Sequence, residues 1–192
     1  MLKSVESLNM NEFKKEFITF CRRVVSLHVI VYFLAGIFAL LCLNYEELFS
    51  NETTSLLMRP VDSPIVAAGP GLQIINGFMM SLYLFPFKTI FIAGKRSWLK
   101  LFFLLLGFSI FSPQSPTFGS LEGIIYTKIP IWNHLLSIPE CLIYSILFSV
   151  LLFAWYKRPK KAWNILSVIA VMLIVLASVA GVLAAIGALG SN

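Results

Sequence analysis

Apolar runs of about 20 residues constrain this chain more than any other feature of its sequence. A helix rises about 1.5 Å per residue and the hydrocarbon core of a bilayer is about 30 Å thick, so one such run crosses a membrane. The predicted spans are residues 24–43, 70–92, 95–112, 138–156 and 162–189, of which the third is the shortest. Because 58% of the residues are hydrophobic and only 12% are charged, a soluble core cannot hold all the apolar side chains. The sequence predicts an all-α polytopic integral membrane protein, a bundle of about five transmembrane helices.

The Lys and Arg residues alternate between the two ends of the predicted spans. Thirteen of the 15 lie before the first span, around the junction of the second and third spans from Lys88 to Lys100, or between the fourth and fifth. Only Arg59 and Lys128 lie in the other two connections, residues 44–69 and 113–137. Cytoplasmic loops carry an excess of Lys and Arg, so we expect a cytoplasmic N-terminus and a C-terminus on the other side. A plasma membrane or a bacterial inner membrane is the expected location.

Residues 1–23 precede the first span and carry apolar and charged residues in alternation. Asn9 and Glu12 fit the two positions of a capping box at a helix start. Three aromatic residues follow at helical spacing, namely Phe13, Phe17 and Phe20. This pattern predicts a cytoplasmic amphipathic helix at the membrane interface. A plain cytoplasmic extension of the first span is the alternative. Residues 24–192 are expected to form one transmembrane domain.

Residues 69–71 read Gly-Pro-Gly inside an otherwise apolar stretch. A nucleotide-binding P-loop needs Lys and then Ser or Thr after its last glycine, and Leu72 and Gln73 stand there instead. Proline is tolerated in the first turn of a helix, where its missing N–H would be unpaired anyway. The sequence therefore predicts a helix that begins at Pro70 with Gly69 as its cap. The positive end of its dipole faces the outer side.

Gln73 and Asn76 are three residues apart and share one face of this predicted helix. Amides in apolar surroundings need hydrogen-bond partners. The favoured interpretation is that they bond to neighbouring helices or to the loop backbone. The alternative is a polar pocket for an anionic or carbonyl group at the helix N-terminus, with Tyr126 of the outer loop as a third candidate binding residue.

Reactive side chains gather in the outer loops. Glu122 and His134 lie in residues 113–137, and Asp62 lies in residues 44–69. Two carboxylates and a histidine are suited to acid–base catalysis if they converge, although no known spacing links them. Solvated loop residues are the favoured interpretation. His28 and His134 are too far apart along the chain topology to share a metal, and each is expected to be a lone hydrogen-bonded histidine.

Two more patterns concern helix ends and helix contacts. Ser137, Pro139 and Glu140 have the spacing of a capping box at the start of the fourth span. Small residues recur at four-residue spacing in the fifth span, at Ala177, Gly181 and Ala185. Such a stripe lets helix backbones approach closely. It predicts packing against another helix of this chain, a second copy or another membrane protein.

Several function classes receive no support. The net charge of +6 does not indicate nucleic-acid binding, because the basic residues lie in clusters beside apolar runs. Cys21, Cys42 and Cys141 form no CxxC pair, and no metal site or cofactor is predicted. Standard catalytic signatures are missing, which favours a protein that is not an enzyme.

Two functional hypotheses remain from the sequence. The first is a non-enzymatic scaffold, accessory subunit or homo-oligomer in contact with membrane lipids. The second is a small transporter or a lipid-handling enzyme with its site on the non-cytoplasmic face.

Overall fold

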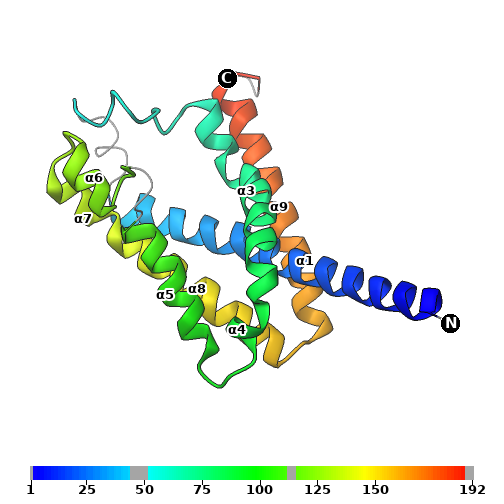
Figure 1. Cartoon of the computed structure of the whole chain (residues 1–192). Helices are drawn as coiled ribbons and strands as arrows, with labels where there is room; N and C mark the ends of the chain where they lie inside the picture. Colours follow the sequence, from blue (N-terminus) through cyan, green and yellow to red (C-terminus); the bar gives the residue numbers. More distant parts are fainter. Residues whose placement is uncertain (1, 44–51, 112–115, 189–192) are drawn as a thin grey trace.

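The computed structural model describes residues 2–43, 52–111 and 116–188, and all regular secondary structure in these ranges is helical. For residues 2–9 only the backbone is described. The chain begins with α1 (Leu2–Cys42), followed by α3 (Pro64–Leu84), the 3-10 turn η1 (Phe85–Phe87) and α4 (Lys88–Ile92). It continues with α5 (Ser97–Phe111), the short helices α6 (Leu121–Tyr126) and α7 (Ile131–Leu136), then α8 (Ile138–Lys157) and α9 (Lys161–Ala185). The predicted helical class is confirmed (Figure 1).

Four helical stretches are long and apolar enough to cross a membrane: Met10–Cys42, Pro64–Ile92, Ile131–Lys157 and Lys161–Ala185. They are compatible with an integral membrane protein. The third predicted span, residues 95–112, corresponds to α5, which has only 15 residues. The number of spans therefore stays a prediction.

The predicted start of the second span at Pro70 is wrong, because α3 begins at Pro64 and carries Pro70 in its interior. Ser63 is extended and Pro64 occupies the first turn, so the favourable N-terminal proline is six residues earlier than expected. Pro70 disturbs the helical ladder, and the next amide, Gly71 N–H, donates to Ser178 Oγ of α9 at 3.0 Å. A neighbouring helix thus supplies an acceptor beside the interior proline.

The predicted capping box at Asn9 and Glu12 is also wrong, since α1 runs unbroken from Leu2 and Asn9 lies inside it. The three phenylalanines of this part of α1 surround Phe85 of η1. Ring centroids are 5.4 Å from Phe85 for Phe13, 5.1 Å for Phe17 and 5.5 Å for Phe20. The apolar face of the N-terminal segment therefore packs on the chain itself, edge to face.

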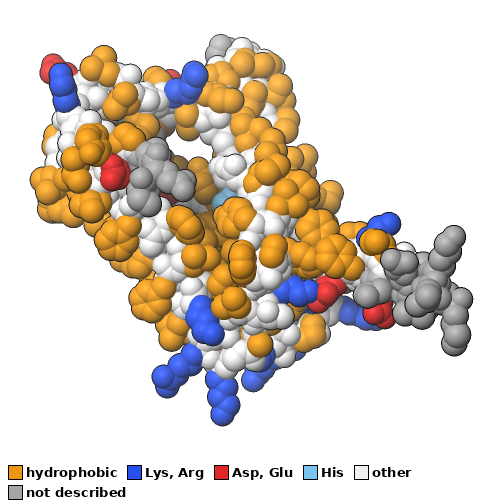
Figure 2. All heavy atoms as spheres, in the orientation of Figure 1, with side chains coloured by type: hydrophobic (Ala, Val, Ile, Leu, Met, Phe, Trp, Pro, Cys, Tyr) orange, Lys and Arg blue, Asp and Glu red, His pale blue; other side chains and the backbone are white. Residues whose placement is uncertain are grey.

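A buried core lies toward the end of the bundle where α4 meets α5 and α8 meets α9. We call this part the closed half. Its fully or nearly buried residues are Phe20, Val24, Leu27 and Val31 of α1, Met80 and Leu84 of α3, Phe91 of α4, Leu101 and Leu105 of α5, and Phe148, Leu152 and Trp155 of α8. Lys and Arg side chains gather at the same end (Figure 2).

α1 crosses α3 and α9 at a wide angle, whereas α5 runs beside α8 (Figure 1). At the α1–α3 crossing, a Cβ built on Gly77 would lie 3.0 Å from Val25 Cα. In α9, a Cβ built on Gly181 would lie 3.3 Å from Ala67 Cβ of α3. One member of the predicted small-residue stripe thus packs within the chain, while Ala177 and Ala185 are exposed.

Candidate functional site

A cavity of about 1090 Å³ lies between α1, α3, α5 and α8, in the half of the bundle opposite the closed half. We call this part the open half. Its 17 lining residues are His28, Tyr32 and Ala35 of α1, Gln73, Asn76, Met79, Met80 and Tyr83 of α3, Leu104, Leu105, Phe108 and Ser109 of α5, Phe118 of the segment before α6, and Ser137, Glu140, Cys141 and Tyr144 at the start of α8. Within each helix they follow the spacing of one helix face. A histidine is visible in the hollow in Figure 2.

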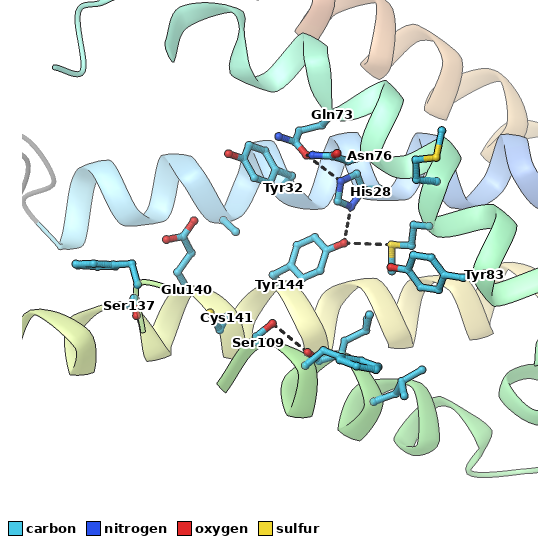
Figure 3. A pocket seen from close by; sticks show the side chains of 17 residues that line it. His28, Tyr32, Gln73, Asn76, Tyr83, Ser109, Ser137, Glu140, Cys141 and Tyr144 are labelled. Atoms are coloured by element: carbon cyan, nitrogen blue, oxygen red, sulfur yellow. Dashed lines mark hydrogen bonds between the residues drawn. The ribbon is translucent and has the colours of Figure 1, made fainter. Parts of the chain in front are cut away.

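A chain of hydrogen bonds joins three helices at the floor of the cavity (Figure 3). His28 Nε2 lies 3.0 Å from Gln73 Oε1, and His28 Nδ1 lies 2.5 Å from the Tyr144 hydroxyl oxygen. Asn76 Nδ2 donates to the same Gln73 Oε1 at 2.8 Å. The network ties α1, α3 and α8 together through side chains that each sit on the inner face of their helix.

The partners fix the direction of these hydrogen bonds. A carbonyl oxygen only accepts, so His28 Nε2 carries a hydrogen and donates it to Gln73. The Tyr144 hydroxyl has one proton and two neighbours, His28 Nδ1 and the Met80 sulfur at 3.7 Å. Because a thioether is a weak acceptor, the proton goes to Nδ1. His28 is therefore a neutral imidazole, and the floor is polar but carries no charge.

The walls of the cavity are mostly apolar and reach the surface between α3 and α5. α3 packs on α1 and α9, whereas α5 packs on α8 and α4. Three lining residues are well exposed, Met79 by 50%, Tyr83 by 55% and Phe108 by 61%. The cavity is thus accessible from the side of the bundle that α3 and α5 leave unjoined.

Glu140 lines the wall of the cavity from the first turn of α8, about one turn before Tyr144 of the floor. The predicted capping box is wrong, because the Ser137 side chain makes no capping hydrogen bond to the first turn of α8. Ser137 precedes α8, but it has helical rather than extended angles, and its hydroxyl donates to His134 O at 2.8 Å. α7 runs almost directly into α8, which leaves no extended residue to act as a cap. The Glu140 carboxylate belongs to the cavity lining.

His134 lies in α7 and is held by the turn that precedes α6. It is 1% exposed, and its ring stacks on Phe118 with centroids 5.5 Å apart. Nδ1 accepts from Gly119 N–H at 3.0 Å, so Nε2 carries the hydrogen and lies 3.2 Å from Thr127 Oγ1. Both ring nitrogens of His134 therefore have hydrogen-bond partners, Gly119 and Thr127. The hydrogen-bonded role expected for both histidines is confirmed.

The remaining candidates from the sequence lie apart from the cavity lining. Asp62 is exposed before α3, Glu122 is in the first turn of α6, and Tyr126 is 71% exposed at the end of α6. No bond or distance that the structure shows joins Asp62, Glu122 and His134, and their catalytic role stays a prediction. Within the described residues, no group of three or more His, Cys, Asp or Glu side chains is placed to hold a metal ion.

Gln73 and Asn76 line the cavity, and the bond from Gln73 to His28 of α1 is the kind of contact that the favoured interpretation of these amides predicted. A binding role for them stays a prediction. Because α3 begins at Pro64, they lie in its third and fourth turns, beyond the reach of the N-terminal dipole. Their hydrogen-bond network with His28 and Tyr144 was not predicted from the sequence. One signal was present, since the polar residues of α8 recur at helical spacing from Ser137 and Glu140 to Tyr144.

Compared with known protein families, curated proteins and solved structures, the chain matches none of them.

Proposed function

We propose that this chain is a multi-pass membrane protein that binds an amphipathic molecule from the bilayer in the cavity of its open half. The observation that carries the proposal is the cavity itself. It combines a hydrogen-bonded polar floor with apolar walls and opens sideways between α3 and α5. Its volume of about 1090 Å³ is at the upper end of the range for small-molecule sites, which suits a ligand with an apolar chain.

The same proposal includes the topology. Five spans, with the N-terminus in the cytoplasm and the C-terminus outside, place the basic end of the molecule in Figure 2 at the cytoplasmic surface. The cavity then lies in the outer half of the bundle. A bacterial inner membrane or a plasma membrane fits this arrangement.

Binding is favoured over catalysis because the floor is already satisfied. His28 is held by Gln73 and Tyr144, and the Ser109 hydroxyl donates to Leu105 O at 3.0 Å within its own helix. An activated nucleophile needs an adjacent base. Of these two hydroxyls only that of Tyr144 adjoins an imidazole, and its proton is held in the bond that joins α8 to α1. A lipid-handling enzyme built on Asp62, Glu122 and His134 is less favoured, since none of them lines the cavity.

A scaffold or accessory subunit is the alternative proposal. It would use the exposed Ala177 and Ala185 of α9 to contact a second copy or another membrane protein. Such a role does not require the cavity to be occupied. The two proposals therefore differ in what filling the cavity does.

The test uses photolabelling of the full chain in phosphatidylcholine nanodiscs. The probe is a fatty alcohol that carries a diazirine, which is a neutral amphiphile. We expect labelled peptides from α3 and α8, and we expect Met79→Trp to abolish this labelling by filling the cavity. Met172→Trp is the matched control, because Met172 lies on α9 and is 59% exposed, against 50% for Met79.

The Gln73→Ala, Asn76→Ala double variant tests how much the polar floor of the cavity contributes to binding of the probe. If the cavity binds amphiphiles, the variant should label more weakly at α3 and α8 while its lipid-facing labelling stays unchanged. Equal labelling of α9 and the cavity helices in every variant would contradict the proposed function and favour the scaffold.

A further inference from the structure

We propose that the cavity selects amphipathic cations, with the Glu140 carboxylate as the counter-charge for the positive group of the ligand. This inference rests on the proposed function and names the class of its ligand. It follows from the charges that line the cavity, from the place of Glu140 among aromatic side chains, and from the distribution of basic residues over the molecule.

The first observation is the charge inventory of the lining. Glu140 is the one lining residue with an acidic side chain, and no Lys or Arg is among the described residues that line the cavity. The hydrogen-bond directions at the floor make His28 neutral. The described part of the lining therefore contains one acidic side chain and no Lys or Arg, although the whole chain has a net charge of +6.

The second observation concerns the surroundings of the carboxylate. Glu140 extends from α8 toward α1, on the same side of the cavity as Tyr32 (Figure 3). Tyr32 and Cys141 line the cavity together with Glu140. The cavity lining also contains Phe108 and Phe118. Aromatic faces attract organic cations, and the attraction grows when water is excluded.

The third observation is that the basic residues lie elsewhere. Arg23 is buried in the closed half, with its guanidinium 4.2 Å from the Tyr156 ring centroid. Most of the other Lys and Arg side chains seen in Figure 2 gather at that end of the molecule, and the rest lie at the opposite end, outside the cavity lining. An anionic head group in the cavity would face Glu140 without a basic partner from the lining. Like charges in such a site oppose binding, so the cavity discriminates by repulsion as well as by attraction.

This inference reverses one expectation from the sequence. The pocket for an anionic group relied on a helix N-terminus beside Gln73, which the structure moves six residues away to Pro64. The floor amides instead offer neutral hydrogen bonding to the polar part of the ligand. Charge recognition falls to Glu140, and the apolar chain of the ligand lies along the wall between α3 and α5.

Two probes of the same shape and opposite charge test the inference. Tetraphenylphosphonium and tetraphenylborate are both large apolar ions, so their difference in affinity reports charge. Binding is measured by equilibrium dialysis against the full chain in phosphatidylcholine nanodiscs, with empty nanodiscs subtracted. We expect saturable binding of the phosphonium at least about tenfold tighter than that of the borate, which corresponds to about 1.4 kcal/mol.

Glu140→Gln removes the charge and keeps the shape of the side chain. We expect it to weaken phosphonium binding about tenfold or more, and to weaken labelling by the neutral diazirine alcohol much less. Glu52→Gln is the matched control, because it removes the same charge from an exposed residue outside the lining. Thermal unfolding of each variant shows whether it is folded. If Glu140→Gln is not, Glu140→Asp must keep the preference for the phosphonium.

The outcomes separate the two proposals. If the borate binds wild type as tightly as the phosphonium, or a folded Glu140→Gln binds the phosphonium normally, the cation preference is wrong while amphiphile binding stands. If neither ion binds saturably and the neutral probe fails to label the cavity, the proposed function itself is wrong.

Discussion

The closed half and the open half of the bundle share four helices, α1, α3, α5 and α8, yet they bury different chemistry. In the closed half, large apolar side chains from α1, α3, α5 and α8 fill the space between the helices, with Phe148 at 0% exposure and Leu84 and Leu101 at 1%. In the open half, a cavity occupies that space, and the helices are joined across its floor by His28, Gln73 and Tyr144.

This difference indicates that the two halves of the bundle have different roles. Close packing of apolar side chains gives a rigid, well-defined arrangement. Hydrogen bonds between side chains can hold helices at a distance and still leave room for a ligand. The two halves meet where Phe148 stacks on Tyr144, with ring centroids 5.9 Å apart. We expect stability to come mainly from the closed half and binding from the open half.

The largest effect should come from Phe148→Ala. The side chain is fully buried, and its loss leaves a cavity that the surrounding helices cannot fill, at a cost of about 3–5 kcal/mol. The measurement is the free energy of unfolding in detergent micelles. The control is Ile146→Ala, at a residue 43% exposed, which should change stability by only about 0.5 kcal/mol. Equal effects of the two variants would erase the distinction between the halves.

A second effect tests the α1–α3 crossing, which lies between the halves. Gly77→Ala places a Cβ 3.0 Å from the Val25 backbone and 3.3 Å from His28 Cβ, so the two helices must separate. We expect a loss of about 1–3 kcal/mol in unfolding free energy. Gly71→Ala is the matched change, because its Cβ would meet only the Ser178 side chain at 3.4 Å. It should be close to neutral, since alanine favours the helix.

If Gly77→Ala proved as well tolerated as Gly71→Ala, the crossing would not be tight. The floor of the cavity would then lose its explanation, because His28 reaches Gln73 only where Gly77 lets α1 approach α3.

The parts of this picture that were predictable are those that depend on one helix at a time. Apolar runs were sufficient for the helical class, and the α8 boundaries came within one residue. The start of α3 was predicted wrongly because both Pro64 and Pro70 could occupy the first turn of the helix. Beside Pro70 inside the helix, the Gly71 amide hydrogen is accepted by Ser178, which is 107 residues away in sequence. No local pattern contains that contact.

The site shows the same limit. Gln73 and Asn76 stood out because amides are rare in an apolar span. His28 and Tyr144 are separated by 116 residues, and their pairing depends on how α1 and α8 pack. Glu140 was assigned a local capping role because the local pattern was complete. Its place in the cavity depends on how α8 packs beside α1 and α5, which no local pattern contains.

A smaller stability effect is expected from Tyr144→Phe in the open half. The substitution keeps the ring on Phe148 but removes the hydroxyl, so His28 Nδ1 loses its donor. A lost hydrogen bond of this kind costs about 1–2 kcal/mol. Tyr83→Phe is the control, because Tyr83 lines the same cavity and is 55% exposed. Thermal unfolding of both variants gives the comparison, and a loss as large as that of Phe148→Ala would mean that the open half stabilises the fold.

The smallest effect concerns the edge of the closed half, where Lys88 forms an ion pair with Glu16 of α1. Glu16 is 60% exposed, so solvent screens the pair and it should contribute less than about 1 kcal/mol. Lys88 Nζ also lies 4.5 Å from the Phe85 ring centroid, a contact that Glu16→Gln leaves in place. A double-mutant cycle of Lys88→Met and Glu16→Gln, run at low and high salt, isolates the pair. A coupling energy that is small and vanishes in salt would leave apolar packing as what holds α1 to η1. A large coupling that persists in high salt would show instead that the charges fix this end of α1, and that the closed half depends on electrostatics as much as on its core.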